Sequence, residues 1–235
     1  MAERKVSLPE AAPPVQKVLM GCAVLEPYLT PLLDDGTPAT FFDLGLHDQP
    51  SLLGPTLQEQ LDALPGPTTV LIGYGLCGNG VVGLEAGLHT LILPKAHDCI
   101  GMAYGSNEAH SAAVLANPGT YYVTRGWIGT GNDPLEQYES YVEQYGLERA
   151  DRIVNAFYRS YDRVCLMAFS EEELAEVRPL AAPIVQFFQD RWQLEYVEKI
   201  GDPSFIEGLV TDQHDPPGDF VIVEPGGTVT MEMFF

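Results

Sequence analysis

The fold of this chain is decided by residues 69–99, TVLIGYGLCGNGVVGLEAGLHTLILPKAHDC. Two apolar runs at its ends, residues 69–73 and 90–93, have the length of buried β-strands. A glycine-rich turn and a stretch that we expect to be helical, residues 81–86, separate them. This order predicts a βαβ unit whose two strands lie parallel in one buried sheet.

The same alternation of short apolar runs and amphipathic segments extends over most of the chain. It predicts an α/β protein with a parallel sheet, a three-layer sandwich of Rossmann-like or flavodoxin-like type. Residues 1–15, rich in proline, alanine and charge, are expected to form a disordered tail before one domain at 16–235. The alternation resumes after residue 118, which predicts two similar halves, 16–117 and 118–235.

The expected strands are residues 17–20, 39–44, 69–73, 90–93, 119–123, 162–167, 194–197 and 220–223. The expected helices are residues 25–33, 56–64, 81–86, 106–116, 135–145, 148–159, 171–192 and 203–209. We expect a break in the helix at 171–192 near Pro179 and Pro183, because an interior proline removes a backbone hydrogen bond.

The balance of charge limits the partners of this chain. It carries 33 acidic and 12 basic residues, so its formal net charge is −21. Nucleic acids and anionic membranes bind positively charged surfaces, so we expect neither as a partner. No run approaches the roughly 20 apolar residues that span a bilayer, and the first residues lack the apolar core of a secretory signal. We therefore expect a cytoplasmic protein that acts on a small molecule.

Cysteine and histidine follow the predicted strands in a regular way. Cys22, Cys77 and Cys99 each lie just past a strand, and so do His47 and His97. The carboxyl ends of parallel strands meet at one edge of a sheet, so these side chains are expected to converge. A catalytic zinc commonly takes three such ligands and keeps a fourth position for exchange. The sequence predicts a zinc or other transition-metal site formed by Cys77, His97 and Cys99, with Cys22 or His47 as a fourth ligand or a substrate contact.

The turn around Cys77 has a composition suited to ligand binding. Glycines on both sides free the backbone for tight turns and for close approach of a ligand. The residues expected to contact a cofactor here are Gly75, Gly78, Asn79 and Gly80. Residues 73–78 also match GxGxxG, with Asp98 at about the spacing of a dinucleotide site, so a dinucleotide is an alternative. The same turn is suited to a phosphate or carboxylate if a helix starts there.

Four further residues are candidates for the cofactor or substrate pocket. Ser106 is expected to cap a helix, with ligand binding as the alternative. Tyr122, Arg125 and Trp127 end another strand, where they either wall a pocket and hold an anionic group or pack between the two halves. Cys165 lies in an apolar run and is expected in the core. The chain lacks GxSxG, HExxH, a P-loop and paired CxxC, which excludes the most familiar hydrolases, zinc proteases and nucleoside triphosphatases.

Three blocks of sequence carry a family resemblance: GYGLCGNG at 73–80, LPKAHDCIGMAYGS at 93–106 and PGTYYVTRGWI at 118–128. They closely resemble the signature blocks of the family called domain of unknown function 1638, and the likeness runs from about Cys22 to residues 225–227. Lys95 departs from the pattern, where arginine is expected, which matters if that charge grips a substrate with two hydrogen bonds. The resemblance implies an intracellular protein associated with corrinoid-dependent methyl transfer.

Together these observations predict a zinc-dependent enzyme that activates a small molecule, with methyl transfer and a corrinoid protein partner implied by the resemblance. Asp98 is expected either to orient His97 or to act as a general base. Two alternatives stay open. One is a non-catalytic carrier of a metal or a corrinoid cofactor, and the other is a metal-free enzyme of racemase type that uses Cys77 and Cys99 as paired thiols.

Overall fold

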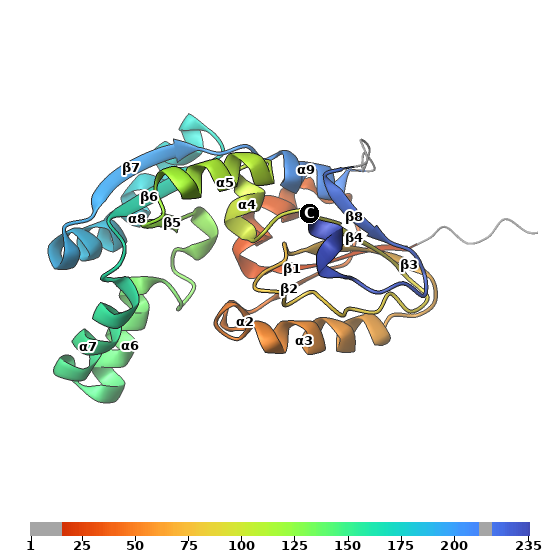
Figure 1. Ribbon diagram of the computed structural model, residues 1–235, viewed down its shortest axis with the longest axis horizontal. Coiled ribbons are helices and arrows are strands. Elements are labelled where there is room, and N and C mark those ends of the chain that lie inside the picture. The colour runs from red at the N-terminus through yellow and green to blue at the C-terminus, as the bar shows by residue number, and fades with distance from the viewer. Residues whose placement is uncertain (1–15, 212–217) are drawn as a thin grey trace, which may run out of the picture.

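The computed structural model describes residues 16–211 and 218–235, so the predicted tail at 1–15 lies outside the described residues. Figure 1 shows two sheets side by side, one of five strands in the order β2-β1-β3-β4-β8 and one of three in the order β5-β6-β7. The first sheet contains β1 (Gln16–Cys22), β2 (Ala39–Phe42), β3 (Thr68–Gly73), β4 (Thr90–Pro94) and β8 (Phe220–Val223). The second contains β5 (Thr120–Val123), β6 (Arg163–Ala168) and β7 (Glu195–Ile200). Neighbouring strands are parallel except β4 and β8, which confirms the predicted α/β class.

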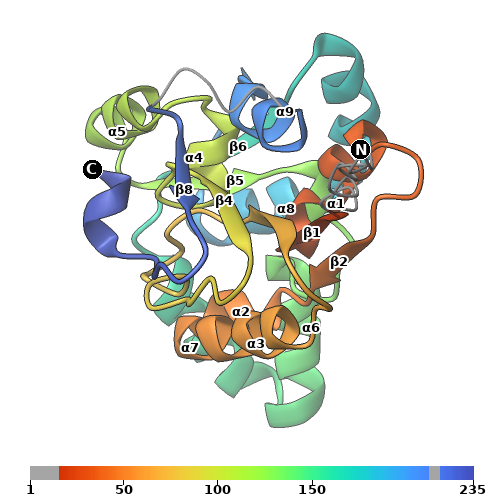
Figure 2. The ribbon, with the colours of Figure 1, turned by 90° about the vertical axis from the view of Figure 1, so that its right-hand side faces the viewer.

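Helices cover both faces of the first sheet and make three layers. Successive side chains of a strand point to opposite faces, so Val70 and Ile72 of β3 face one core and Leu71 faces the other. On one face lie α2 (Gly45–Asp48) and α3 (Pro50–Asp62), and on the other lie α1 (Glu26–Leu29), α4 (Cys99–Ala103) and α9 (Ser204–Val210). Figures 1 and 2 both show α3 and α9 on opposite sides of this sheet. The predicted three-layer sandwich is confirmed.

The second sheet has its own core. Its strands pack against the longest helix, α8 (Glu171–Trp192), and against α7 (Leu147–Tyr158), through a cluster centred on the fully buried Phe188. α5 (Asn107–Ala116) follows α4 in the chain, and α6 (Pro134–Tyr145) precedes α7. Figures 1 and 2 show α6 and α7 as a hairpin that projects from this part of the molecule.

No helix in the described part of the chain has both the length and the apolar character needed to cross a bilayer.

The expected break in the helix at 171–192 is absent, because α8 continues through Pro179 and Pro183. Both prolines are exposed, whereas the buried side of α8 carries residues such as Val177, Ala181 and Ile184. The carbonyls that lose a partner at a proline therefore lie on the solvent side, where water satisfies them. The prediction was wrong about the break and right about the extent of the helix.

The helix expected at residues 81–86 is also absent, since this connection runs through turns instead. Gly83 has a φ of +92° and Gly87 a φ of +57°, which no α-helix accommodates. The C-terminal segment takes up the backbone hydrogen bonds that a helix would have used. Val229 accepts one from Gly83 N at 2.9 Å and donates one to Leu84 O at 2.9 Å.

The C-terminal strand returns to the first sheet. β8 pairs antiparallel with β4, so both residue ranges of the predicted halves contribute to the five-stranded sheet. The division into similar halves at 16–117 and 118–235 stays a prediction. Two short helices, α2 and α4, were not predicted, and α3 begins at Pro50 rather than at residue 56.

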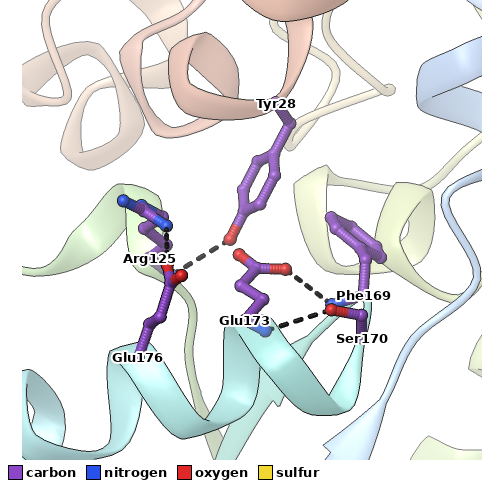
Figure 3. Close-up of polar contacts among 6 residues, drawn as sticks. All are labelled: Tyr28, Arg125, Phe169, Ser170, Glu173 and Glu176. Atoms are coloured by element: carbon purple, nitrogen blue, oxygen red, sulfur yellow. Dashed lines mark hydrogen bonds and ion pairs between the residues drawn. The ribbon is translucent and has the colours of Figure 1, made fainter.

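Figure 3 shows how the two sheets are joined. The hydroxyl of Tyr28, from α1, accepts a hydrogen bond from the backbone N–H of Arg125 at 3.1 Å, and its ring meets that of Phe169 edge to face at 4.8 Å. Glu173 of α8 accepts from the N–H of Phe169 at 2.8 Å. Arg125 forms an ion pair with Glu176 at 3.2 Å. Of these contacts, those of Tyr28 cross from the first sheet's part to the second, whereas the contacts of Glu173 and Glu176 tie α8 to the segments that follow β5 and β6.

Gly126 controls this junction, since a β-carbon there would collide with the carbonyl oxygen of Val24. We expect Gly126→Ala to lower the free energy of unfolding by about 2 kcal/mol or more, because the added methyl group has to displace backbone. Chemical denaturation of wild type and variant measures this. Gly218→Ala is the control, because no described residue lies within 4 Å of its β-carbon position. Equal stability of Gly126→Ala and Gly218→Ala would contradict the described junction.

Candidate functional site

A cavity of about 250 Å³ lies where β1, β2, β3 and β4 end. Cys22 is the last residue of β1, Cys77 lies in the turn after β3, and Cys99 begins α4 after β4. The cavity is lined by Cys22, Asp43, Leu46, Pro50, Leu53, Gly73, Tyr74, Cys77, Gly78, His97, Asp98 and Cys99. The three cysteines that the sequence placed at strand ends therefore share one cavity.

Two backbone hydrogen bonds bring the second and third cysteines together. Beyond the last paired residues of β3 and β4, Leu76 N donates to Ala96 O and Cys77 N donates to His97 O, each at 2.8 Å. Gly75 makes this approach possible, because a β-carbon there would lie 2.6 Å from the Ala96 oxygen. Gly75 thus allows the segment that carries Cys77 to pack closely against the segment that carries His97.

The backbone at Cys77 is strained. Its φ is +46°, and the following Gly78 and Asn79 have φ values of +64° and +69°. A residue with a β-carbon loses about 1–2 kcal/mol in this left-handed region, where glycine is the usual choice. Backbone strain of this kind clusters at functional sites, which makes Cys77 a candidate functional residue.

The three thiols influence one another. Burial is the main reason that the pKa of Cys77 is raised to about 12, and the charges of Asp98 and Cys22 add to it. Burial also raises the pKa of Cys99 well above its ordinary value, with further contributions from Asp98, Cys77 and Cys22. The pKa of Cys22 is raised by burial in the same way. Without a positive charge in the cavity, all three thiols stay protonated at neutral pH.

Asp98 and His97 have structural contacts that the sequence did not reveal. Asp98 is the N-cap of α4, where its Oδ1 accepts from Gly101 N at 2.7 Å. The ring of His97 meets those of Phe235 and His110 in tilted contacts, with centroid distances of 5.6 and 6.2 Å. His110 is buried, and its Nδ1 has no hydrogen-bond partner among the described residues.

A ready-made metal centre is not present in the part of the chain that the structure describes. Among the described residues, no group of three or more His, Cys, Asp and Glu side chains is placed to hold a metal ion. His47 belongs to α2, but its side chain lies outside the described residues, so its predicted role is not addressed. The predicted ligands Cys77, His97 and Cys99 nevertheless all line the cavity.

The other predicted contacts lie partly at the cavity and partly elsewhere. Gly78 lines it, while Gly75 and Gly80 lie close to neighbouring segments and Asn79 is exposed. Ser106 caps α5 through Ala109 N at 3.1 Å. The remaining three candidates are not among the residues that line the cavity: Tyr122 bonds the hydroxyl of Tyr104 at 2.9 Å, Arg125 pairs with Glu176, and Trp127 packs against the core of the first sheet.

The dinucleotide and phosphate alternatives lose their structural basis. Both need a helix that begins directly after the glycine-rich turn, so that its N–H groups face the phosphate. Residues 77–83 form turns, and the next element after β3 is the strand β4.

Two polar residues of the cavity were missed by sequence reasoning. Asp43 follows β2, and Tyr74 follows β3 between Gly73 and Gly75. The rule that selected the cysteines, a polar side chain just past a strand, applies to both. Tyr74 is only 5% exposed, and its hydroxyl has no hydrogen-bond partner among the described residues.

Comparison with known proteins gives one match. The model of the family described as protein of unknown function (DUF1638) matches residues 41–210, which confirms the resemblance seen in the three blocks. No curated protein and no solved structure matches the chain.

The strain at Cys77 predicts an unusual order of variant stabilities. Cys77→Gly is expected to be more stable than Cys77→Ala by about 1 kcal/mol, because glycine adopts a positive φ at no steric cost. Denaturant melts of both proteins measure the difference. At Cys22, where φ is −71°, the order should reverse, so the pair Cys22→Gly and Cys22→Ala is the control. Alanine proving as stable as glycine at position 77 would contradict the strained backbone.

The raised thiol pKa values predict low reactivity. In protein treated with a chelator at pH 7, we expect Cys77 and Cys99 to react with iodoacetamide at least about tenfold more slowly than free cysteine, and Cys22 to react more slowly than free cysteine, because only the thiolate attacks. Mass spectrometry of the labelled peptides over time gives the rates. A cavity thiol that reacts faster than free cysteine would contradict this and favour the metal-free enzyme with paired thiols.

Proposed function

We propose that this chain, which belongs to the protein of unknown function (DUF1638) family, is a cytoplasmic enzyme that activates a small molecule with a zinc ion held by cysteines. The observation that carries the proposal is the convergence of Cys22, Cys77 and Cys99 on one cavity. Thiols from three separate strand ends are not needed to fill a core, which apolar residues fill better.

The charge of the cavity supports a cation as the missing component. Asp43 and Asp98 lie beside the three thiols, and none of the described lining residues is a lysine or an arginine. Burial and these negative charges keep the thiols protonated when no cation is present. A bound divalent cation reverses this balance, because a coordinating thiol is deprotonated outright. Sulfur ligands select soft metals, of which zinc is the usual one.

The ligands that we now propose are Cys22, Cys77 and Cys99. Cys22 takes the place that the sequence assigned to His97, because the three thiols come from the ends of three neighbouring strands and share one cavity. Each thiol turns about its χ1 bond, and coordination would require the three thiols to move toward one another from the positions described, which form no metal-holding group. His97 stays near the cavity as a residue that shapes its wall.

The residues around the cavity determine which chemistry a bound zinc ion would support. When bound, zinc with three protein ligands supplies an open position at which a thiol, an alcohol or water binds as its anion. Leu46, Pro50 and Leu53 form an apolar part of the cavity wall. Asp98 uses Oδ1 for the cap of α4, and its Oδ2 is the proposed acceptor of the proton that the bound molecule loses.

The reaction class that we propose is group transfer to or from the bound molecule. Methyl transfer with a corrinoid protein as partner is the form that the family resemblance suggests. A non-catalytic carrier would bind the metal equally well but would show no turnover, so activity assays separate the two.

Metal analysis tests the proposal directly. Protein purified without added metal is expected to contain about one zinc ion per chain, and Cys99→Ser is expected to lose at least about 90% of it, since one of three ligands is removed. Plasma mass spectrometry gives the metal content. Cys165→Ser is the matched control, because Cys165 is buried in β6 of the other sheet. Equal and negligible zinc contents of wild type and Cys99→Ser would contradict the proposal.

A further inference from the structure

The hydroxyl of Tyr74 is a buried polar group that the fold leaves unused. Tyr74 is 5% exposed, and its oxygen has no hydrogen-bond partner among the described residues. A buried tyrosine hydroxyl normally finds a partner, because leaving it unpaired costs the hydration that it has lost. A side chain of the same shape without the hydroxyl, phenylalanine, would fill the position without this cost.

This hydroxyl lies at the cavity, among the sulfur atoms. Tyr74 lines the cavity, and Cys22, Cys77 and Cys99 all act on it electrostatically. The Cys22 thiol is close to it, but the hydroxyl has no hydrogen-bond partner of standard geometry among the described residues. The protein itself therefore leaves the donor of this buried hydroxyl unused beside the cavity.

The other residues that line the cavity limit the chemical class of molecule that can bind there. Asp43 and Asp98 contribute negative charge, and the described lining contains no lysine or arginine to hold a phosphate or a carboxylate. The net charge of −21 repels anions further. Leu46, Pro50 and Leu53 offer an apolar wall for a short carbon chain. A volume of about 250 Å³ is below the usual range of pockets for drug-sized ligands, so the molecule is small.

We infer that Tyr74 is a substrate-binding residue whose hydroxyl donates a hydrogen bond to the sulfur or oxygen of a small, uncharged thiol or alcohol in this cavity. This inference rests on the proposed function, since zinc would hold the same atom as its anion. A charge-assisted hydrogen bond to a thiolate or alkoxide is stronger than one to a neutral group. The phenol thus selects for the atom that binds the metal, and the carboxylates select against acidic substrates.

Binding of two matched probes tests the inference. 2-Mercaptoethanol and 3-mercaptopropionate share a thiol and a two-carbon chain and differ in a hydroxyl or a carboxylate at the other end. Isothermal titration of zinc-loaded wild type is expected to show at least tenfold tighter binding of 2-mercaptoethanol. Tyr74→Phe is expected to weaken that binding by about 5- to 20-fold. Equal affinity for the two probes, or unchanged binding by Tyr74→Phe, would overturn the inference.

Thermal stability separates ligand binding from a structural role of the hydroxyl. Tyr74→Phe removes an unpartnered group, so its melting temperature without ligand is expected to equal or exceed that of wild type. Tyr28→Phe is the control, because the Tyr28 hydroxyl accepts from Arg125 N at 3.1 Å. It should melt about 2–4 °C lower and bind 2-mercaptoethanol as wild type does. A loss of stability in Tyr74→Phe as large as that in Tyr28→Phe would contradict the inference.

The zinc content of each protein, measured in the same samples, keeps the two proposals apart. Absence of zinc from wild type counts against the proposed function. Zinc retained in wild type and Tyr74→Phe, with equal binding of both probes, counts against the role of Tyr74 alone.

Discussion

The site depends on the pairing of two backbone segments beyond the ends of β3 and β4. Leu76 and Cys77 donate to the carbonyls of Ala96 and His97, and these two hydrogen bonds continue the contact between the strands into the cavity wall. They fix the distance between the turn that carries Cys77 and the start of α4, where Cys99 lies. Gly75 is the residue that permits the approach, because any side chain there meets the Ala96 carbonyl.

The surrounding fold serves this pairing. α3 covers one face of the first sheet and brings Leu53 to the cavity, while the segment after β8 occupies the backbone groups of residues 83–86. The connection between β3 and β4 consequently runs as turns and leaves the strand ends open. A helix that began directly after the turn would have favoured anions at its N-terminus, whereas the described lining holds two aspartates and no lysine or arginine.

The strands and most long helices could be predicted because buried parallel strands are short continuous apolar runs and surface helices are amphipathic. The convergence of the three cysteines followed from the same rule, since parallel strands end at one edge. The continuation of α8 through Pro179 and Pro183 could not be predicted, because the sequence does not show that both prolines lie on the exposed face of the helix. The return of β8 to β4 depends on contacts between distant residues, which periodicity does not encode. Tyr74 was missed because an aromatic residue between glycines reads as packing until its hydroxyl is seen to be unpartnered.

The central claim is that three thiols surround one point, and crystals of the protein as purified test it most directly. Anomalous difference maps at the zinc absorption edge are expected to show one peak with the sulfur atoms of Cys22, Cys77 and Cys99 about 2.3 Å away. Sulfur atoms that point away from one another, with no peak between them, would contradict the account.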